Sequence, residues 1–299
     1  MKSIELLGRR RITGGGTDHD HPVFTPDGRW IVCAAGAFGN QDIYLLDRRG
    51  RFARRLTNDP GNETPASFTP DGIRLAYCAQ AGPATADETR AKTAPWEILT
   101  LDLVPGAKPE RLLGDGRSSF KQPDYSPDGR RMAYFSNERS PGTFHLFVLD
   151  LESRERTEIT AEPNRIDCHP AWAPDGRRLA FHAYEGIDSD RANIYVIDTL
   201  DGAVVRLTDR PGLSKHPCFV TDRIVIFHRE EPGEWPALFA VDLEKGREVR
   251  LSPPGAWEKQ PNVVRTRKGV LKVVFASRRE PPQGEPVFDL YTATLAGLG

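Results

Sequence analysis

The residues best suited to chemistry are histidines and glutamines that recur at one place in the sequence, directly before a proline. Six positions share this place: His21, Thr64, Gln122, His169, His216 and Gln260. Because the second unit has one extra residue between its proline and its aromatic residue, Pro65 is the alternative to Thr64 there. Imidazole nitrogens ligate zinc, copper, nickel and iron(II), and an amide oxygen can complete the coordination shell. A divalent metal ion on His21, His169 and His216 is therefore one prediction. The alternative is a polar channel whose side chains bond to water and to one another.

Two further histidines, His182 and His228, occupy matching positions in the segments F-H-A and F-H-R. Each follows a phenylalanine in a predicted strand, where successive side chains point to opposite faces. We expect both to pack between neighbouring structural units. The other interpretation places them among the ligand-binding residues.

A second group of candidates carries positive charge or a large aromatic ring at predicted loops. Its members are Arg139, Arg165, Lys215, Arg229, Trp257 and Arg278. Guanidinium and ammonium groups would favour a carboxylate, uronate or phosphate ligand, and an indole offers a stacking surface. Most charges of this kind are simply solvated, so these positions are weaker candidates than the residues before proline.

Cys168 lies directly before His169, an arrangement that invites comparison with a cysteine nucleophile and its base. Alternation along a strand should send the two side chains to opposite sides, so we predict that they diverge. The other cysteines are Cys33, Cys78 and Cys218, and no C-x-x-C pair occurs. We expect all four to be free, mostly buried thiols.

A repeat positions all of these residues. The segment H-P-V-F-T-P-D-G-R-W-I-V at 21–32 returns as P-A-S-F-T-P-D-G-I-R-L-A-Y at 65–77 and Q-P-D-Y-S-P-D-G-R-R-M-A-Y at 122–134. Residues 169–181 are a further close copy, 216–227 are a worn copy, and another unit begins at 260. Proline presets φ, aspartate bonds to nearby backbone and glycine tolerates positive φ, so each unit predicts strand, tight turn, strand.

Two more apolar runs follow in most units. The first usually ends at aspartate, as at 43–47 and 194–198, and the second has the form R-x-L-T, as at 205–208. Four short strands per unit are typical of β-propeller blades. Units that begin near 21, 64, 122, 169, 216 and 260 predict an all-β, six-bladed propeller in one domain, 1–299. The last unit lacks a fourth strand, and residues 9–14 have the sequence to supply it.

This pattern resembles the TolB-like six-bladed propellers, a family of WD40-like PD repeats. The resemblance rests on aromatic-S/T-P-D-G, I-Y-x-x-D and R-x-L-T, and it covers nearly the whole chain. It implies a binding module that holds a protein, a peptide or a small anionic ligand through its loop face and channel mouth. No nucleophile elbow, phosphate loop or H-E-x-x-H motif is present.

An alternative resemblance leads to a metal-dependent enzyme acting on anionic sugars. Oligogalacturonate lyases are similar propellers with a histidine- and glutamine-ligated metal near the axis. That likeness implies a metal at His169 and His216, with His21 or a glutamine, that polarises a uronate carboxylate. The lyases' closely spaced ligand cluster is missing here. Because His21 and His169 come from opposite blades, we expect only some of the ring residues to reach one ion.

Composition narrows the partners. The net charge is −1 with 28% charged residues, which gives a mixed surface without a global attraction for nucleic acid or anionic membranes. No apolar run is long enough for a membrane helix or a signal peptide. We therefore expect no nucleic-acid partner, no membrane insertion and a cytoplasmic location, or a periplasmic one if the N-terminus has been processed.

Overall fold

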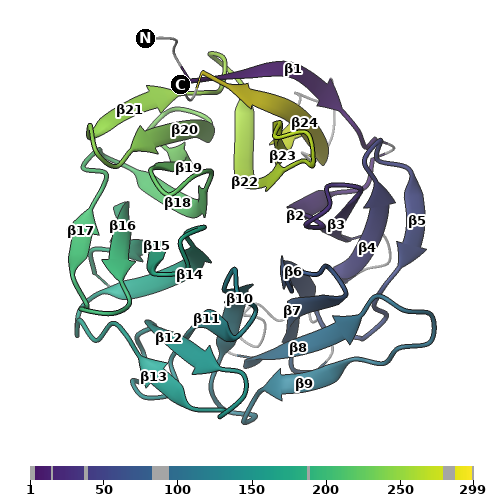
Figure 1. Cartoon of the computed structure of the whole chain (residues 1–299), viewed down its shortest axis with the longest axis vertical. Coiled ribbons are helices and arrows are strands. Elements are labelled where there is room, and N and C mark those ends of the chain that lie inside the picture. The colour runs from purple at the N-terminus through teal and green to yellow at the C-terminus, as the bar shows by residue number, and fades with distance from the viewer. Residues whose placement is uncertain are drawn as a thin grey trace.

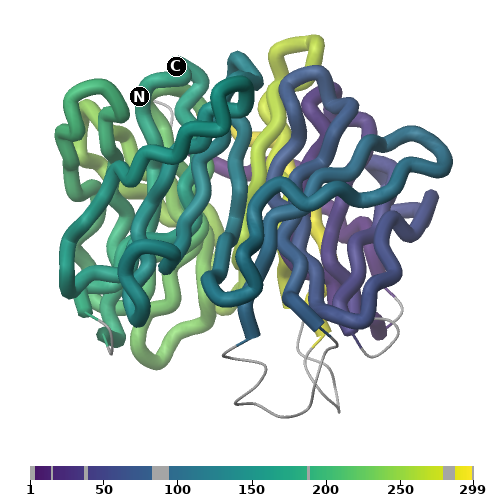
Figure 2. The backbone as a smooth tube through the Cα atoms, turned by 90° about the horizontal axis from the view of Figure 1, so that it is seen from below, coloured from purple at the N-terminus to yellow at the C-terminus, as the bar shows by residue number. Residues whose placement is uncertain are grey.

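The computed structural model describes residues 4–14, 16–36, 40–82, 94–186, 189–278 and 287–297. All regular elements in these ranges are β-strands, and their sheets stand around a central axis in a β-propeller arrangement (Figure 1). The strands run between two faces of the molecule, as the side view shows (Figure 2). We call the face with the Pro-Asp-Gly turns the turn face and the opposite one the loop face.

Five sheets contain the strands of the described residues, and each sheet is built mainly from consecutive antiparallel strands. The first comprises β2 (His19–Phe24), β3 (Trp30–Ala35), β4 (Asp42–Asp47) and β5 (Phe52–Arg55). The second comprises β6 (Glu63–Phe68), β7 (Arg74–Gln80), β8 (Trp96–Asp102) and β9 (Glu110–Leu113). The third comprises β10 (Phe120–Tyr125), β11 (Arg131–Ser136), β12 (His145–Asp150) and β13 (Arg156–Glu158).

The next sheet has eight strands and contains two repeat units. One unit is β14 (Ile166–Trp172), β15 (Arg178–Tyr184), β16 (Ala192–Asp198) and β17 (Val204–Arg206). The other is β18 (Leu213–Phe219), β19 (Ile224–Glu230), β20 (Ala237–Asp242) and β21 (Arg247–Arg250). A single parallel pairing, Ala192 with Leu213, joins the two units.

The remaining sheet connects the two ends of the chain. Its order is β1 (Glu5–Arg11), β24 (Phe288–Ala296), β23 (Leu271–Arg278) and β22 (Trp257–Arg265). The N-terminal strand therefore lies beside the last one (Figure 1). It covers residues 5–11 rather than the predicted 9–14. Beyond it, the Thr13 hydroxyl turns inward and accepts the Leu290 N–H at 2.8 Å.

The turn chemistry follows from the repeated residues. At the first turn, the Gly28 N–H donates to the Thr25 carbonyl at 2.8 Å and the Thr25 N–H donates to the Trp30 carbonyl at 3.0 Å. The Thr25 hydroxyl also donates to the Asp27 carboxylate at 2.7 Å. Gly28 has a φ of 66°, a conformation that glycine adopts without cost. The turn thus reverses the chain direction, so that the second strand of the unit pairs antiparallel with the innermost strand.

The core lies between neighbouring sheets. Phe24 of β2 and Ile31 of β3 belong to one buried cluster with Val274 of β23 and Leu290 of β24. Comparable clusters fill the other spaces between adjacent units. Packing of this kind holds the innermost strands around the axis. In the described part of the chain, no helix is long and apolar enough to cross a membrane.

Candidate metal and ligand site

A strained backbone conformation aims the residues before proline at the axis. Five of them have positive φ between 47° and 54°: His21, Gln122, His169, His216 and Gln260. The strand register shifts at the same place in the innermost strands that carry these five residues, which marks a β-bulge. A residue before proline is normally extended, so this conformation costs free energy, on the order of 1–3 kcal/mol per residue. Such strain persists where surrounding structure enforces it.

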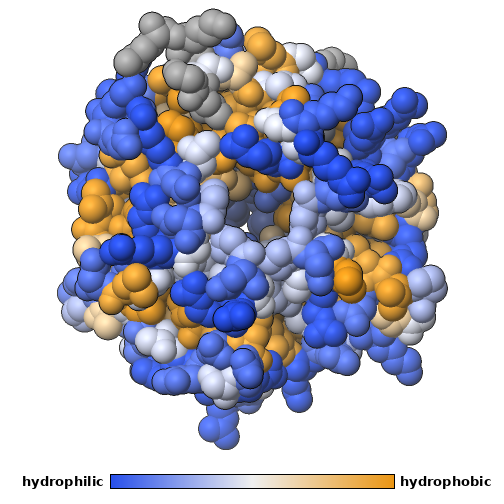
Figure 3. Space-filling model, in the orientation of Figure 1, coloured by the Kyte–Doolittle hydropathy of each residue, from blue (hydrophilic) through white to orange (hydrophobic). Residues whose placement is uncertain are grey.

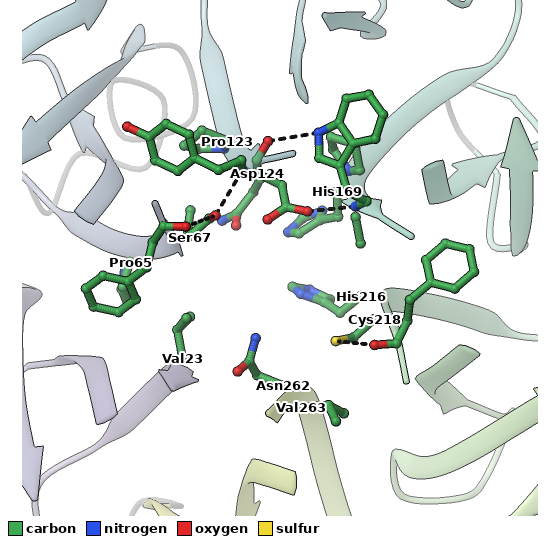
Figure 4. A pocket seen from close by; sticks show the side chains of 18 of the residues that line it. Val23, Pro65, Ser67, Pro123, Asp124, His169, His216, Cys218, Asn262 and Val263 are labelled. Atoms are coloured by element: carbon green, nitrogen blue, oxygen red, sulfur yellow. Dashed lines mark hydrogen bonds between the residues drawn. The ribbon is translucent and has the colours of Figure 1, made fainter. Parts of the chain in front are cut away.

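A cavity of about 490 Å³ lies along the axis. The residues before proline line one end, and turn residues Pro26, Pro70 and Pro127 line the other. The cavity therefore runs toward the turn face, whereas ligand binding was predicted at the loop face and the channel mouth. The space-filling view shows a hollow at the axis (Figure 3). His169, His216 and Asp124 reach this space from separate strands (Figure 4).

Thr64 does not share this position. Pro65 and Ala66 line the cavity in the second unit, whereas Thr64 pairs with Cys78 across β6 and β7. This unit has one extra residue between its proline and its aromatic residue, which moves the bulge to Pro65–Ser67. Thr64 is thus a predicted site residue that the structure places behind the cavity wall.

The histidines converge more closely than the sequence predicted. One potential ligand atom from each of His21, His169 and His216 lies within 4.8 Å of the others. The rings of His169 and His216 have centroids 4.0 Å apart. The ring centroid of His182 lies 4.9 Å from that of His169, and the ring centroid of His228 lies 5.0 Å from that of His216. Five of the seven histidines therefore form one cluster. Three of the six ring residues come within reach of one ion, and His21 and His169 are both among them although they belong to distant repeat units.

Burial keeps this cluster neutral. Loss of solvent lowers the pKa of His21 and His228 and lowers those of His169, His182 and His216 well below the ordinary value. Neighbouring imidazoles reinforce the effect at His169 and His216. A neutral imidazole has a free lone pair, which is the form that ligates metal. The neutral imidazoles of this cluster can therefore donate lone pairs to a cation.

Two buried imidazole nitrogens without hydrogen-bond partners are consistent with a cation site. The Nδ1 atoms of His169 and His182 are buried and make no hydrogen bond to any described residue. A buried polar atom without a partner costs about 1–3 kcal/mol, so a ligand that engages these two nitrogens would stabilise the folded protein. The donor set fits a divalent transition-metal ion, because imidazoles dominate it.

Gln260 supports His21 from the neighbouring innermost strand. Its Oε1 accepts the His21 backbone N–H at 3.1 Å, and its Nε2 lies 3.1 Å from the Nε2 of His21. The Gln260 backbone N–H in turn donates to the His228 Nδ1 at 3.4 Å. These contacts fix two of the imidazoles relative to the axis.

Ion pairs lie on the loop-face side of the cluster. Lys215 contacts Glu230 at 2.7 Å, and Lys259 contacts Asp20 at 3.3 Å. Burial alone would raise the pKa of Glu230, yet the contacts with His228 and Lys215 lower it to about 2. Lys215, a predicted ligand-binding residue, is therefore paired with a carboxylate.

The other predicted face residues are dispersed. Arg139 contacts Glu158 at 3.4 Å, and Arg165 contacts Asp167 at 2.6 Å. The structure places Arg229 in the interior, 1% exposed, where it makes two 2.6 Å bonds to Glu248. Its guanidinium is thus occupied, because it reaches from β19 past β20 to Glu248 on β21. None of these three lines the axial cavity.

Trp257 and Arg278 form a separate feature near the end of the chain. The Trp257 ring stacks on Trp235 with a centroid distance of 4.5 Å. The Arg278 guanidinium lies 4.4 Å from the Trp257 centroid. These aromatic contacts pack the edge of β22 and do not reach the axial cavity.

Cys168 and His169 do not diverge as predicted. Their potential ligand atoms lie within 4.8 Å of each other and of His182. The bulge at His169 breaks the simple alternation on which the prediction rested. The pair is nevertheless unsuited to nucleophilic chemistry, because burial raises the pKa of the Cys168 thiol and disfavours the thiolate. All four cysteines are free, as expected.

Sequence reasoning missed Asp124, which lines the cavity. Burial raises the pKa of its carboxyl to about 6. Its position, directly before the repeat aromatic residue, is polar in two other units as Ser67 and Asn262. This periodic polarity inside an otherwise apolar strand is the signal that could have identified it.

Comparisons with known proteins agree with the fold. A family model described as the TolB beta propeller domain matches residues 84–283. An uncharacterized protein of Agrobacterium fabrum is 27% identical over 144 residues, which are 48% of this chain and 43% of that protein. The chain spans less than half the length of the curated relatives it matches.

Two solved structures have similar architecture. TolB from Acinetobacter baumannii is 18% identical with a TM-score of 0.61, over 96% of this chain and 63% of that one. An oligogalacturonate lyase in complex with manganese is 16% identical with a TM-score of 0.62, over 99% and 96% of the two chains. At these identities the likeness is one of fold.

Proposed function

The chain belongs to the TolB β-propeller domain family, and from that premise we propose that it is a binding module whose axial cavity holds a small anionic ligand through a metal ion. We infer six blades, because the eight-stranded sheet divides at its single Ala192–Leu213 pairing into two units of four strands. The blades act as a rigid frame for the histidine cluster.

One observation carries this proposal: the convergence of three neutral imidazoles on the axis. His21, His169 and His216 offer ligand atoms within 4.8 Å of one another. They would hold a divalent transition-metal ion such as zinc, nickel or iron(II). When bound, the ion supplies positive charge and open coordination positions for an anionic group.

The cavity suits a small ligand. Its volume of about 490 Å³ lies within the range of small-molecule pockets. Prolines and aromatic side chains, including Phe68 and Trp172, contribute to its wall, with Asp124 and Asn262 as polar groups. Entry is from the turn face, since the ion pairs of Lys215 and Lys259 lie on the other side of the cluster. A protein or peptide partner would have to insert a narrow segment from this face.

Metal analysis of the purified, untagged protein tests the proposal. We expect at least one equivalent of a transition metal, and the loss of one equivalent in the double variant His21→Ala/His216→Ala, which removes two ligands that belong to the axial group alone. His145→Ala is the matched control, because His145 pairs with Glu158 at 2.7 Å outside the cluster. Absence of metal, even after incubation with zinc, nickel or iron(II), would overturn the metal site and leave a partner to be sought by pull-down.

A second candidate is a metal-dependent enzyme acting on anionic sugars. The observation that favours it is the lyase fold match over nearly the full length of both chains, together with the histidine cluster. In this interpretation the metal-loaded cluster binds a uronate carboxylate, and a neutral histidine or a lysine accepts the α-proton. Incubation of the metal-loaded protein with oligogalacturonates, followed by detection of the unsaturated product, tests it. No product above that of the double variant would exclude this candidate.

A further inference from the structure

A second cluster of ligand atoms lies beside the first. Cys168, His169 and His182 each offer one atom, and these atoms lie within 4.8 Å of one another. The cluster shares His169 with the axial group, but its other two members, Cys168 and His182, do not line the axial cavity. A thiol distinguishes its chemistry from the all-imidazole set.

Local structure brings these three side chains together. Cys168 on β14 is the direct antiparallel partner of His182 on β15, so both project from the same face of the sheet. The bulge with positive φ at His169 then rotates that imidazole toward the pair, and its ring centroid lies 4.9 Å from that of His182. The arrangement is thus fixed by the backbone rather than by flexible side chains.

Two observations indicate that the cluster lacks a partner. His182 is 1% exposed, and its Nδ1 makes no hydrogen bond to any residue the structure describes. The Nδ1 of His169 is orphaned in the same way. Hydrophobic packing explains a buried thiol by itself, but it does not explain two unsatisfied imidazole nitrogens beside that thiol.

We propose that Cys168, His169 and His182 form a second metal site, selective for a soft ion such as Zn²⁺ or Cu⁺. Thiolate with imidazole is a ligand set these ions prefer over Mn²⁺ or Mg²⁺. Binding forms a metal–sulfur bond, breaks the S–H bond and releases the proton to solvent. Burial raises the pKa of the Cys168 thiol, Asp167 adds to that shift and Lys121 acts against it, so the metal–sulfur bond has to displace the proton. The site does not require the axial ion.

Cobalt substitution tests this site directly. The reduced, chelator-treated protein is titrated with Co²⁺ under anaerobic conditions, and the sulfur-to-cobalt charge-transfer absorption is recorded. We expect the band in the wild type, its complete loss in Cys168→Ser and its displacement by Zn²⁺. Cys33→Ser is the matched control, since Cys33 is fully buried in another sheet and has no part in the cluster. It should retain the band.

A third variant separates this proposal from the axial site. His21→Ala removes an axial ligand only, so the thiolate band should persist even if binding at the axis is lost. Loss of the band in His21→Ala would overturn a distinct second site, and absence of the band in folded wild type would overturn the site altogether.

A labelling measurement covers the case in which Cys168→Ser fails to fold. Alkylation of the wild type in dilute denaturant is followed by mass spectrometry at each cysteine, with and without Zn²⁺. We expect zinc to slow labelling of Cys168 at least tenfold relative to Cys33. Equal protection of both cysteines would contradict the proposal, because it would reflect overall stabilisation instead of ligation.

Discussion

The carboxylate of Asp124 on β10 accepts a 2.7 Å hydrogen bond from the backbone N–H of Trp172 on β14. The Trp172 indole donates back to the Asp124 carbonyl at 3.1 Å. These two hydrogen bonds thus join the neighbouring innermost strands β10 and β14 at the cavity wall. The same contact occurs elsewhere: Asn262 accepts the Phe24 N–H at 3.0 Å and Ser67 accepts the Tyr125 N–H at 3.0 Å.

This contact makes Asp124→Asn a stabilising substitution at neutral pH. An amide oxygen can accept the Trp172 N–H, as Asn262 does in its unit. Burial raises the pKa of Asp124 to about 6, so the folded state binds the proton more tightly than the unfolded state. The free energy of unfolding of the wild type therefore falls as the pH rises from about 4 to about 6. The expected loss is on the order of 2 kcal/mol, which includes a reduction for screening by solvent in the cavity.

Urea unfolding at pH 4 and pH 8 checks this prediction. The variant should match the wild type at pH 4 and exceed it at pH 8. The reverse substitution, Asn262→Asp, is the matched control and should lose stability at pH 8. If Asp124→Asn were destabilising at both values, the carboxylate would have an ionic partner that the described contacts do not include.

The repeat made the architecture predictable, because its turn residues act locally. In T-P-D-G the hydroxyl, the carboxylate and the glycine each make a contact within the turn, so Thr25, Asp27 and Gly28 determine the reversal without help from distant residues. The position of the N-terminal strand was predicted less well. Its extent depends on pairing with β24, a contact that no local pattern records.

The candidate site could be predicted in composition but not in geometry. Placement of one residue per unit at the axis follows from the repeat, and it identified His21, His169 and His216. The bulge at those positions opposes the usual extended conformation before proline, so alternation gave the wrong relation of Cys168 to His169. The ion pair of Arg229 with Glu248 joins two strands of one sheet and likewise leaves no local signal.

Thr208 tests the role of the last residue in R-x-L-T. Its hydroxyl accepts the Ile194 N–H at 3.0 Å and donates to the Asn193 carboxamide at 2.9 Å. Thr208→Val keeps the shape but leaves two buried groups unsatisfied, so we expect a loss of about 2–3 kcal/mol in the free energy of unfolding. Thr208→Ser keeps both bonds and should lose about 1 kcal/mol or less. Chemical denaturation gives both values, and equal losses would rule out the hydrogen bonds as the cause.

Glu63 should make stability depend on pH over a different range from Asp124. Its side chain is fully buried, and burial raises its pKa to about 8, with Asp59 and Asp42 adding to the shift. The folded state therefore retains this proton, so stability falls as pH rises from about 4.5 to about 8 and is constant above. Glu63→Gln should match the wild type at pH 5 and exceed it at pH 9. A stability difference that does not change with pH would show that Glu63 titrates normally.

Gln122 tests whether the strain at the cavity wall is real. Its φ is 47°, a conformation that costs an L-residue about 1–2 kcal/mol and a β-branched residue more. Gln122→Gly removes that strain but gains unfolded-state entropy, so its unfolding free energy should stay within about 0.5 kcal/mol of the wild type. Gln122→Val should lose about 2 kcal/mol.

The control for this series is the corresponding position in the second unit. Thr64 does not have a positive φ, so Thr64→Gly relieves no backbone strain. Its free energy of unfolding should fall by about 1 kcal/mol. Thermal unfolding of the variants gives the order directly. If glycine were equally costly at both positions, the left-handed bulge at Gln122 would not be populated in solution. The aim of His169 and His216 at the axis, which depends on the same bulge, would then need another cause.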